Sequence, residues 1–115
     1  MVMPGHLVGF GGMVGAVLRH IVSEAVARET FPVGTLTVNV VGSFVLGIVT
    51  FLGADSDVLL FVGTGACGSF TTFSSFSHDT VGLWEDGKQY KAVTFAFANI
   101  VGAVFAIGLA WFVAL

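Results

Sequence analysis

Charged residues are scarce in this chain. They make up 10% of its 115 residues, against roughly 25% in soluble domains, while hydrophobic residues make up 56% and the mean hydropathy is +0.98. Too few polar side chains are present to cover a water-soluble globule, so we interpret the chain as an integral membrane protein. The net charge of −3 and the lack of a basic patch argue against nucleic acid as a partner.

Residues and motifs for catalysis are also missing. Cys67 is the single cysteine, so an internal disulfide is excluded. The chain contains no HExxH, GxSxG or phosphate-loop motif, and no pair of carboxylates lies within an apolar stretch. We therefore expect a protein that is not an enzyme, and its length predicts a single domain over residues 1–115.

Four hydrophobic stretches lie between charges and helix breakers. They cover about residues 4–22, 33–52, 58–83 and 92–115. Each has close to the roughly 20 residues with which an α-helix crosses the hydrocarbon core, and a helix satisfies its own backbone there. The loops are short, so the expected fold is an all-α domain of four transmembrane helices. Small residues four apart in the first and fourth stretches predict close helix contacts inside the subunit and, in part, with another subunit.

The third stretch has an unusual composition. Residues 64–77 read TGACGSFTTFSSFS, with few of the aliphatic side chains that suit lipid. Gly65 and Gly68 weaken a helix, and threonine hydroxyls can bond backbone groups instead. Irregular backbone at membrane depth is tolerated where it is buried in protein or lines a cavity. We therefore expect a break near residues 68–72 at a functional centre; an intact, hydroxyl-rich packing helix is the alternative.

Candidate polar and aromatic residues accompany this stretch. Asn39 lies roughly 9 Å inside the second stretch, at 1.5 Å per residue, where an amide either joins two helices or donates to a ligand. Phe73 and Phe76 share a helix face, which is more often a packed core than a site. Arg19, near the end of the first stretch, either faces a water-filled recess or extends to the membrane interface.

These candidates include no acidic residue. A cation path or a proton-coupled site would require a carboxylate inside the membrane. An anion instead requires N–H and O–H donors, and it can meet the positive edge of a phenyl ring. The residues therefore favour a small anion as the ligand.

Three segments resemble motifs of the Fluc (CrcB) fluoride channel family. Residues 11–20 (GGMVGAVLRH) resemble its GGxxGAxxR opening, residues 34–47 contain its VN pair at Asn39, and residues 65–77 (GACGSFTTFSSFS) resemble its GxxGxxTTFSTFS. The segments come in the family's order and span nearly the whole chain. The resemblance implies a fluoride-selective channel that passively exports fluoride from the cytoplasm, confers fluoride resistance, and assembles as an antiparallel dimer with a broken third helix.

The resemblance also implies roles for individual residues. The fluoride pathway would be formed by Asn39, Phe73, Phe76, Ser74 and Ser75. A central structural sodium ion would be held by the backbone carbonyls of Gly68 and Thr71, and Arg19 would make an aqueous vestibule attractive to anions. The chain departs from the family at Asp79, where glutamate is usual, and at Ser75, where threonine is common. Phe95 and Asn99 occupy the places of an expected tyrosine and serine in the fourth helix.

The basic residues predict an orientation. Arg19, Arg28, Lys88 and Lys91 all fall at or near one side of a four-span topology, and the other side has none. The positive-inside rule then places both termini outside the cell membrane. A subunit with a fixed orientation would pair with an inverted homologue, which we favour over an antiparallel copy of itself.

Two other functions compete with the channel. A small four-helix multidrug-type transporter would need a glutamate in the first helix, and residues 5–20 contain no acid. A membrane assembly subunit without transport would explain the glycines but not the polar third stretch.

Overall fold

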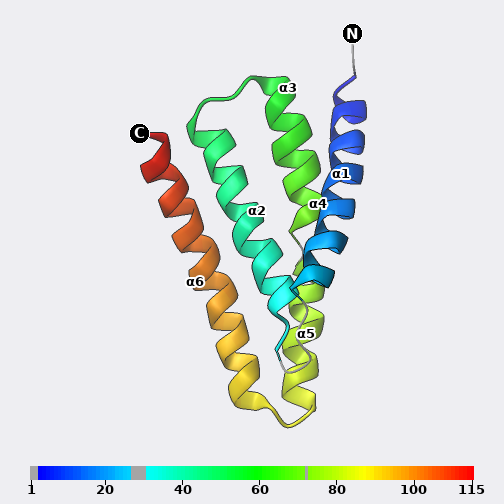
Figure 1. The fold of residues 1–115 in the computed structure, drawn as a ribbon, viewed down its shortest axis with the longest axis vertical. Helices are drawn as coiled ribbons and strands as arrows, with labels where there is room; N and C mark the ends of the chain where they lie inside the picture. Colours follow the sequence, from blue (N-terminus) through cyan, green and yellow to red (C-terminus); the bar gives the residue numbers. More distant parts are fainter. Residues whose placement is uncertain (1–2, 27–30, 72) are drawn as a thin grey trace.

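The protein is a bundle of long helices (Figure 1). The computed structural model describes residues 3–26, 31–71 and 73–115. Its elements are α1 (Pro4–Ala25), α2 (Val33–Phe51), α3 (Ser56–Val58), η1 (Leu59–Cys67), α4 (Gly68–Phe70), α5 (Phe73–Glu85) and α6 (Gln89–Ala114). Four helical segments are long and apolar enough to cross a membrane, namely Pro4–Ala25, Val33–Phe51, Ser56–Glu85 and Gln89–Ala114. The expected all-helical fold with four membrane-spanning segments is confirmed.

Proline and glycine set several helix ends. Pro4 begins α1, where its missing N–H is not needed by the helix. Gly53 and Gly87 have positive φ angles of 68° and 79°, a conformation that glycine adopts without steric cost. They follow α2 and α5, respectively, and turn the chain into the next segment. Both termini consequently lie towards the same end of the bundle as the α2–α3 connection, opposite the α5–α6 turn (Figure 1).

The third segment is built from several short elements. η1 is a π-helix of nine residues, a rare form that is frequent at functional sites. α4 follows it directly and ends at Phe70, and Thr71 then has extended backbone angles of φ −78° and ψ 157°. α5 begins at Phe73, and Thr72 between them lies outside the described residues. The π-helix was not expected from the sequence.

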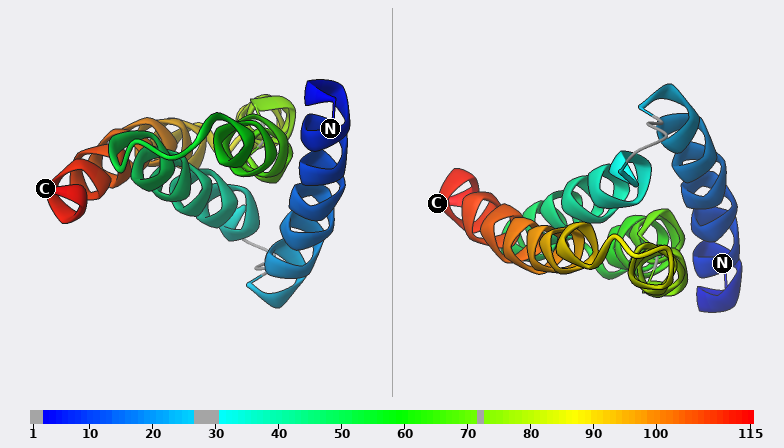
Figure 2. Two further views of the ribbon diagram at one scale, coloured as in Figure 1. Left: turned by 90° about the horizontal axis from the view of Figure 1, so that it is seen from above. Right: turned by 90° about the horizontal axis from the view of Figure 1, so that it is seen from below.

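Two helix pairs dominate the packing: α1 lies along η1, and α2 lies along α6 (Figure 2). A Cβ atom on Gly11 or Gly15 would overlap the carbonyl oxygen of Phe61 or Ala66, so the backbones of α1 and η1 touch. On α6, Ala106 and Ala110 are buried. These small residues make the close contacts predicted within the chain, whereas a Cβ on Gly9 would have no neighbour within 4 Å.

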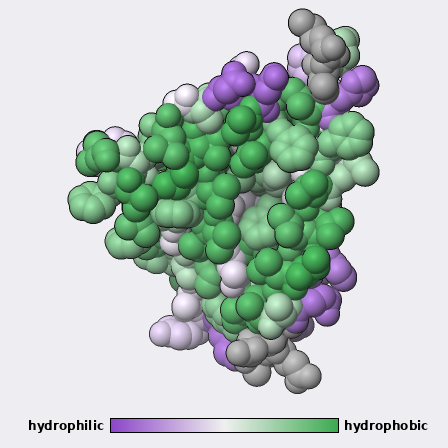
Figure 3. All heavy atoms as spheres, turned by 45° about the horizontal axis from the view of Figure 1, so that its top comes forward, coloured by the Kyte–Doolittle hydropathy of each residue, from purple (hydrophilic) through white to green (hydrophobic). Residues whose placement is uncertain are grey.

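The outer surface of the bundle is apolar. Many large hydrophobic side chains on α1 and α6 are exposed, and they form a broad belt with hydrophilic residues towards its margins (Figure 3). The buried core is small by contrast: it contains a cluster of Leu83, Ala92 and Phe95, with Phe76 packed against it. This distribution suits a chain whose outer face is solvated by lipid.

Candidate functional site

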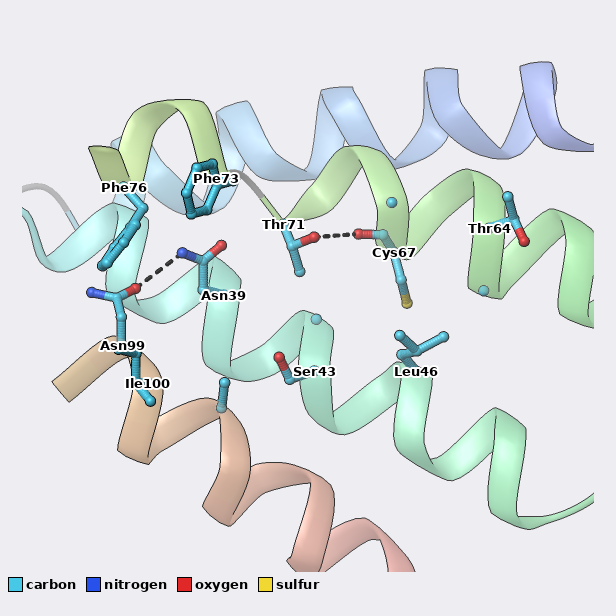
Figure 4. A pocket seen from close by; sticks show the side chains of 14 residues that line it. Asn39, Ser43, Leu46, Thr64, Cys67, Thr71, Phe73, Phe76, Asn99 and Ile100 are labelled. Carbon is cyan, nitrogen blue, oxygen red and sulfur yellow. Dashed lines mark hydrogen bonds between the residues drawn. The ribbon is translucent and has the colours of Figure 1, made fainter. Parts of the chain in front are cut away.

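A pocket of about 580 Å³ lies among α2, the third segment and α6 (Figure 4). Its lining comprises Asn39, Gly42, Ser43, Leu46, Gly63, Thr64, Cys67, Gly68, Thr71, Phe73, Phe76, Asn99, Ile100 and Ala103. Phe73, Thr64 and Gly68 are exposed, so the pocket opens on the surface of the single chain. The described lining carries amides, hydroxyls, a thiol and rings, but no carboxylate.

Two amides form the polar centre of this pocket. Asn39 Nδ2 on α2 donates to Asn99 Oδ1 on α6 across 3.0 Å. Asn99 Nδ2 in turn donates to the carbonyl oxygen of Phe95, one turn earlier on its own helix, across 2.9 Å. Asn99 is 5% exposed and is the buried partner of Asn39, a pairing that the sequence did not reveal.

A row of phenyl rings runs beside the amides. The ring centroids of Phe73 and Phe76 are 5.8 Å apart, and those of Phe76 and Phe95 are also 5.8 Å apart. Phe95 is fully buried and meets the ring of Phe31 edge-on at 5.6 Å, while Phe73 is 79% exposed at the rim. Figure 4 shows Phe73 and Phe76 next to Asn39. The rings therefore lead from the surface of the chain to its core.

On the third segment, just before the rings, Thr71 is tied to the end of the preceding helix. Its hydroxyl donates to the carbonyl oxygen of Cys67 across 2.9 Å, and its backbone N–H donates to the same oxygen across 3.0 Å. Gly68 lies at the pocket surface, and a Cβ added there would have no neighbour within 4 Å. The buried Cys67 thiol also faces the pocket, which its lone occurrence in the sequence did not suggest.

The structure does not bring every predicted residue to the pocket. Among the described lining residues, neither Ser74 nor Ser75 is present, although both follow Phe73 on α5. Arg19 is half-buried on α1, and α1 contributes none of the described lining. Asn39, Phe73, Phe76, Gly68 and Thr71 do meet there.

Sequence reasoning missed two features near these residues. Ser43 lies four residues after Asn39 and therefore on the same face of α2, a spacing that could have marked it. Asp79 accepts a hydrogen bond from Thr35 Oγ1 across 2.8 Å, which joins α5 to α2. Within the described ranges, no group of three or more His, Cys, Asp or Glu side chains is arranged to hold a metal ion.

A family model described as "CrcB-like protein, Camphor Resistance (CrcB)" matches residues 6–111. The chain belongs to the CrcB family. This assignment confirms the resemblance drawn from the three sequence motifs. Together with the four apolar helices, it makes the chain a multi-pass membrane protein.

Curated relatives of this CrcB chain are named as channels. It is 58% identical over 106 residues to "Fluoride-specific ion channel FluC 2" of Haloarcula marismortui, covering 92% of this chain and 89% of that protein. It is 52% identical over 108 residues to "Fluoride-specific ion channel FluC 1" of Halobacterium salinarum, covering 94% and 91%. It is 41% identical over 103 residues to "Fluoride-specific ion channel FluC" of Methanocaldococcus jannaschii, covering 85% and 83%.

Proposed function

We propose that this CrcB chain is a subunit of a fluoride-selective channel. The channel lets fluoride leave the cytoplasm passively, lowers intracellular fluoride and so confers resistance to it. The observation that carries this proposal is the amide pair of Asn39 and Asn99 beside the ring of Phe76, in a pocket whose described lining has no carboxylate. The names of relatives up to 58% identical support the choice of fluoride among small anions.

The pocket lining supplies hydrogen-bond donors and ring edges that can replace the water molecules around an anion. Asn39 Nδ2 carries two N–H groups, so it donates to fluoride while it keeps its bond to Asn99 Oδ1. The ring edges of Phe73 and Phe76 carry partial positive charge, so they stabilise the ion without a formal counter-charge that would trap it. The hydroxyls of Ser74 and Ser75, on the same turn as these rings, act at the rim of the pathway, and Arg19 attracts anions to its aqueous vestibule.

We also infer a break in the third span that holds a structural sodium ion. The extended Thr71 lies between α4 and α5, and carbonyl groups at a helix end lack partners within the helix. Hard cations prefer such oxygen ligands, so the residues fit the ion. The carbonyls of Gly68 and Thr71 would hold sodium, whose charge would neutralise the dipoles of the converging carbonyl groups.

A second subunit completes the pathway. Thr64 and Gly68 are exposed around a pocket whose lining includes amides and hydroxyls, and polar groups left facing lipid are costly. An antiparallel partner would cover this opening. Lys88 and Lys91 lie at the α5–α6 end, so the positive-inside rule puts that end in the cytoplasm and both termini outside. We favour an inverted homologue as the partner over a second copy of this chain.

The membrane potential supplies the driving force. Hydrogen fluoride crosses membranes as a neutral weak acid and dissociates in a neutral cytoplasm, which traps the anion inside. An inside-negative potential favours exit of each fluoride ion by about 2.3 kcal/mol per 100 mV. A passive pore selective for this anion therefore suffices, and no coupling ion is required.

Anion efflux from liposomes tests the proposed function. The purified chain, with its inverted homologue where one exists, is reconstituted into vesicles loaded with potassium fluoride or potassium chloride, and valinomycin starts the efflux. Fast fluoride efflux with negligible chloride efflux is expected. Efflux of neither anion from correctly folded protein would favour an assembly subunit, and equal efflux of both would contradict the selectivity.

A further inference from the structure

The side-chain amide of Asn99 has a defined direction. Its Nδ2 donates to the carbonyl oxygen of Phe95 across 2.9 Å, which commits the nitrogen end of the amide to its own helix. The oxygen end then faces α2, where Oδ1 accepts from Asn39 Nδ2 across 3.0 Å (Figure 4). Because Asn99 is 5% exposed, water cannot readily replace either bond. The two hydrogen bonds therefore run in one direction, from α2 to α6 and then to the α6 backbone.

We propose that Asn99 is a positioning residue that determines which end of the Asn39 amide faces the anion pathway. A primary amide can turn by half a rotation with little change in shape, because its oxygen and its NH₂ group are nearly the same size. With Asn99 Oδ1 held towards it, a turned Asn39 would place two carbonyl oxygens face to face in a part-buried site. Neither oxygen can donate to the other, so the hydrogen bond between α2 and α6 would be lost. Asn99 thereby keeps a donor at position 39.

If the chain conducts fluoride as proposed, the orientation of the Asn39 amide decides whether the pathway attracts or repels the ion. An amide N–H attracts fluoride, whereas an amide oxygen repels it. Asn39 and Phe76 both line the pocket, and the ring of Phe76 lies 5.8 Å from that of Phe95, the residue whose carbonyl anchors Asn99. The Asn39 donor and the Phe76 ring are therefore both positioned by the same turn of α6, the turn from Phe95 to Asn99.

A substitution series at position 99 tests the proposal. Asn99→Leu keeps much of the volume but removes the acceptor. Asn99→Thr is the rescue variant: Thr71, Thr80 and Thr94 each donate to the carbonyl oxygen four residues earlier, so a threonine at 99 can bond Phe95 and present its oxygen to Asn39. Thr94→Val is the matched control, because it removes a side chain to backbone bond from an exposed position of the same helix.

The readout is the fluoride concentration that gives half-maximal flux in liposomes. For Asn99→Leu we expect this concentration to rise about tenfold, because a positioned donor to the anion is lost, while Asn99→Thr recovers most of the affinity and Thr94→Val leaves it unchanged. If leucine prevents folding, Asn99→Ala, which suits a helix rich in alanine, is measured in the same way.

The outcomes separate the two proposals. A lower maximal flux at an unchanged half-saturating concentration would mean that Asn99 only stabilises the fold, and it would overturn the positioning role while the channel stands. Failure of the threonine variant to recover affinity, with the leucine variant impaired, would also overturn it. A wild-type protein without fluoride-selective flux would instead refute the proposed function.

Discussion

Phe76 is central to the row of rings, with centroid distances of 5.8 Å to both Phe73 and Phe95. Phe76→Ile keeps an apolar side chain of similar bulk but removes the positive ring edge. We expect fluoride flux in liposomes to fall at least about tenfold, the effect of losing about 1.4 kcal/mol of stabilisation. Phe97→Ile, at a 68% exposed position of α6, should leave flux unchanged. Equal flux in both variants would remove the Phe76 ring from the pathway.

Asn39 is the second residue to test. Asn39→Asp replaces a donor by a negative charge that faces the Asn99 carbonyl oxygen at about the present hydrogen-bond distance and repels the anion. We expect fluoride flux to be abolished at neutral pH. Asn39→Leu removes the donor without adding charge and should leave a small residual flux. If the aspartate variant conducts as well as the wild type, Asn39 does not contact the ion.

For single residues, the sequence identified the candidate site residues but not the residues to which they are hydrogen-bonded. Asn39 and the two phenylalanines stand out because an amide or grouped rings are unusual in an apolar stretch. The bond from Asn39 to Asn99 joins residues 60 apart, and the bond from Thr35 to Asp79 joins residues 44 apart. Such pairs depend on how each helix is rotated about its axis, which hydropathy does not determine.

At the scale of helices, the four spans were predictable because length and apolarity are set by the bilayer. The π-helix over Leu59–Cys67 was not predictable. Its wider turns use the same residue types as an α-helix, and composition does not indicate which backbone carbonyl a given N–H will choose. The glycines did predict close packing, since Gly11 and Gly15 lie against the backbone of η1.

The contact between α1 and η1 yields a prediction on stability. Gly15→Ala places a methyl group on the Ala66 carbonyl, which cannot rotate away, so the backbones must separate. We expect the unfolding free energy to fall by about 1–3 kcal/mol, measured by chemical denaturation in detergent. The matched control is Gly9→Ala on the same helix, where the methyl group has no neighbour within 4 Å and should be neutral or slightly stabilising. Equal stability of the two variants would contradict the close contact.

For the whole molecule, the position of basic residues predicts one fixed orientation. In a Cys67→Ala background, Ala54→Cys lies at the end that carries the termini and Asp86→Cys at the α5–α6 end (Figure 1). A membrane-impermeant maleimide added to whole cells should label the first fully and the second only after permeabilisation. Half-labelling of both positions would mean that the chain inserts in both orientations, and it would favour the antiparallel dimer of identical copies.

The assembly was harder to predict from the sequence than the residues or the helices. Composition identified the membrane as the solvent, and the exposed apolar belt agrees with it. The partner's identity rests on a charge bias of a few residues, because apolar faces for lipid and for another subunit look alike in hydropathy. The pocket that opens on the surface of the single chain carries amides and hydroxyls, which is why we propose that another subunit covers it.

The contact of α1 with η1 limits which substitutions can alter the pocket during evolution. The third segment is supported from behind by α1, where Gly11 and Gly15 touch the backbone carbonyls of η1. A larger residue at either glycine would push the two helices apart and could not make a small adjustment. The pocket itself is lined largely by side chains, from the third segment as well as from α2 and α6. A gradual shift in ion preference is therefore expected to arise from substitutions among those lining side chains, while Gly11 and Gly15 stay glycine to preserve the contact behind them.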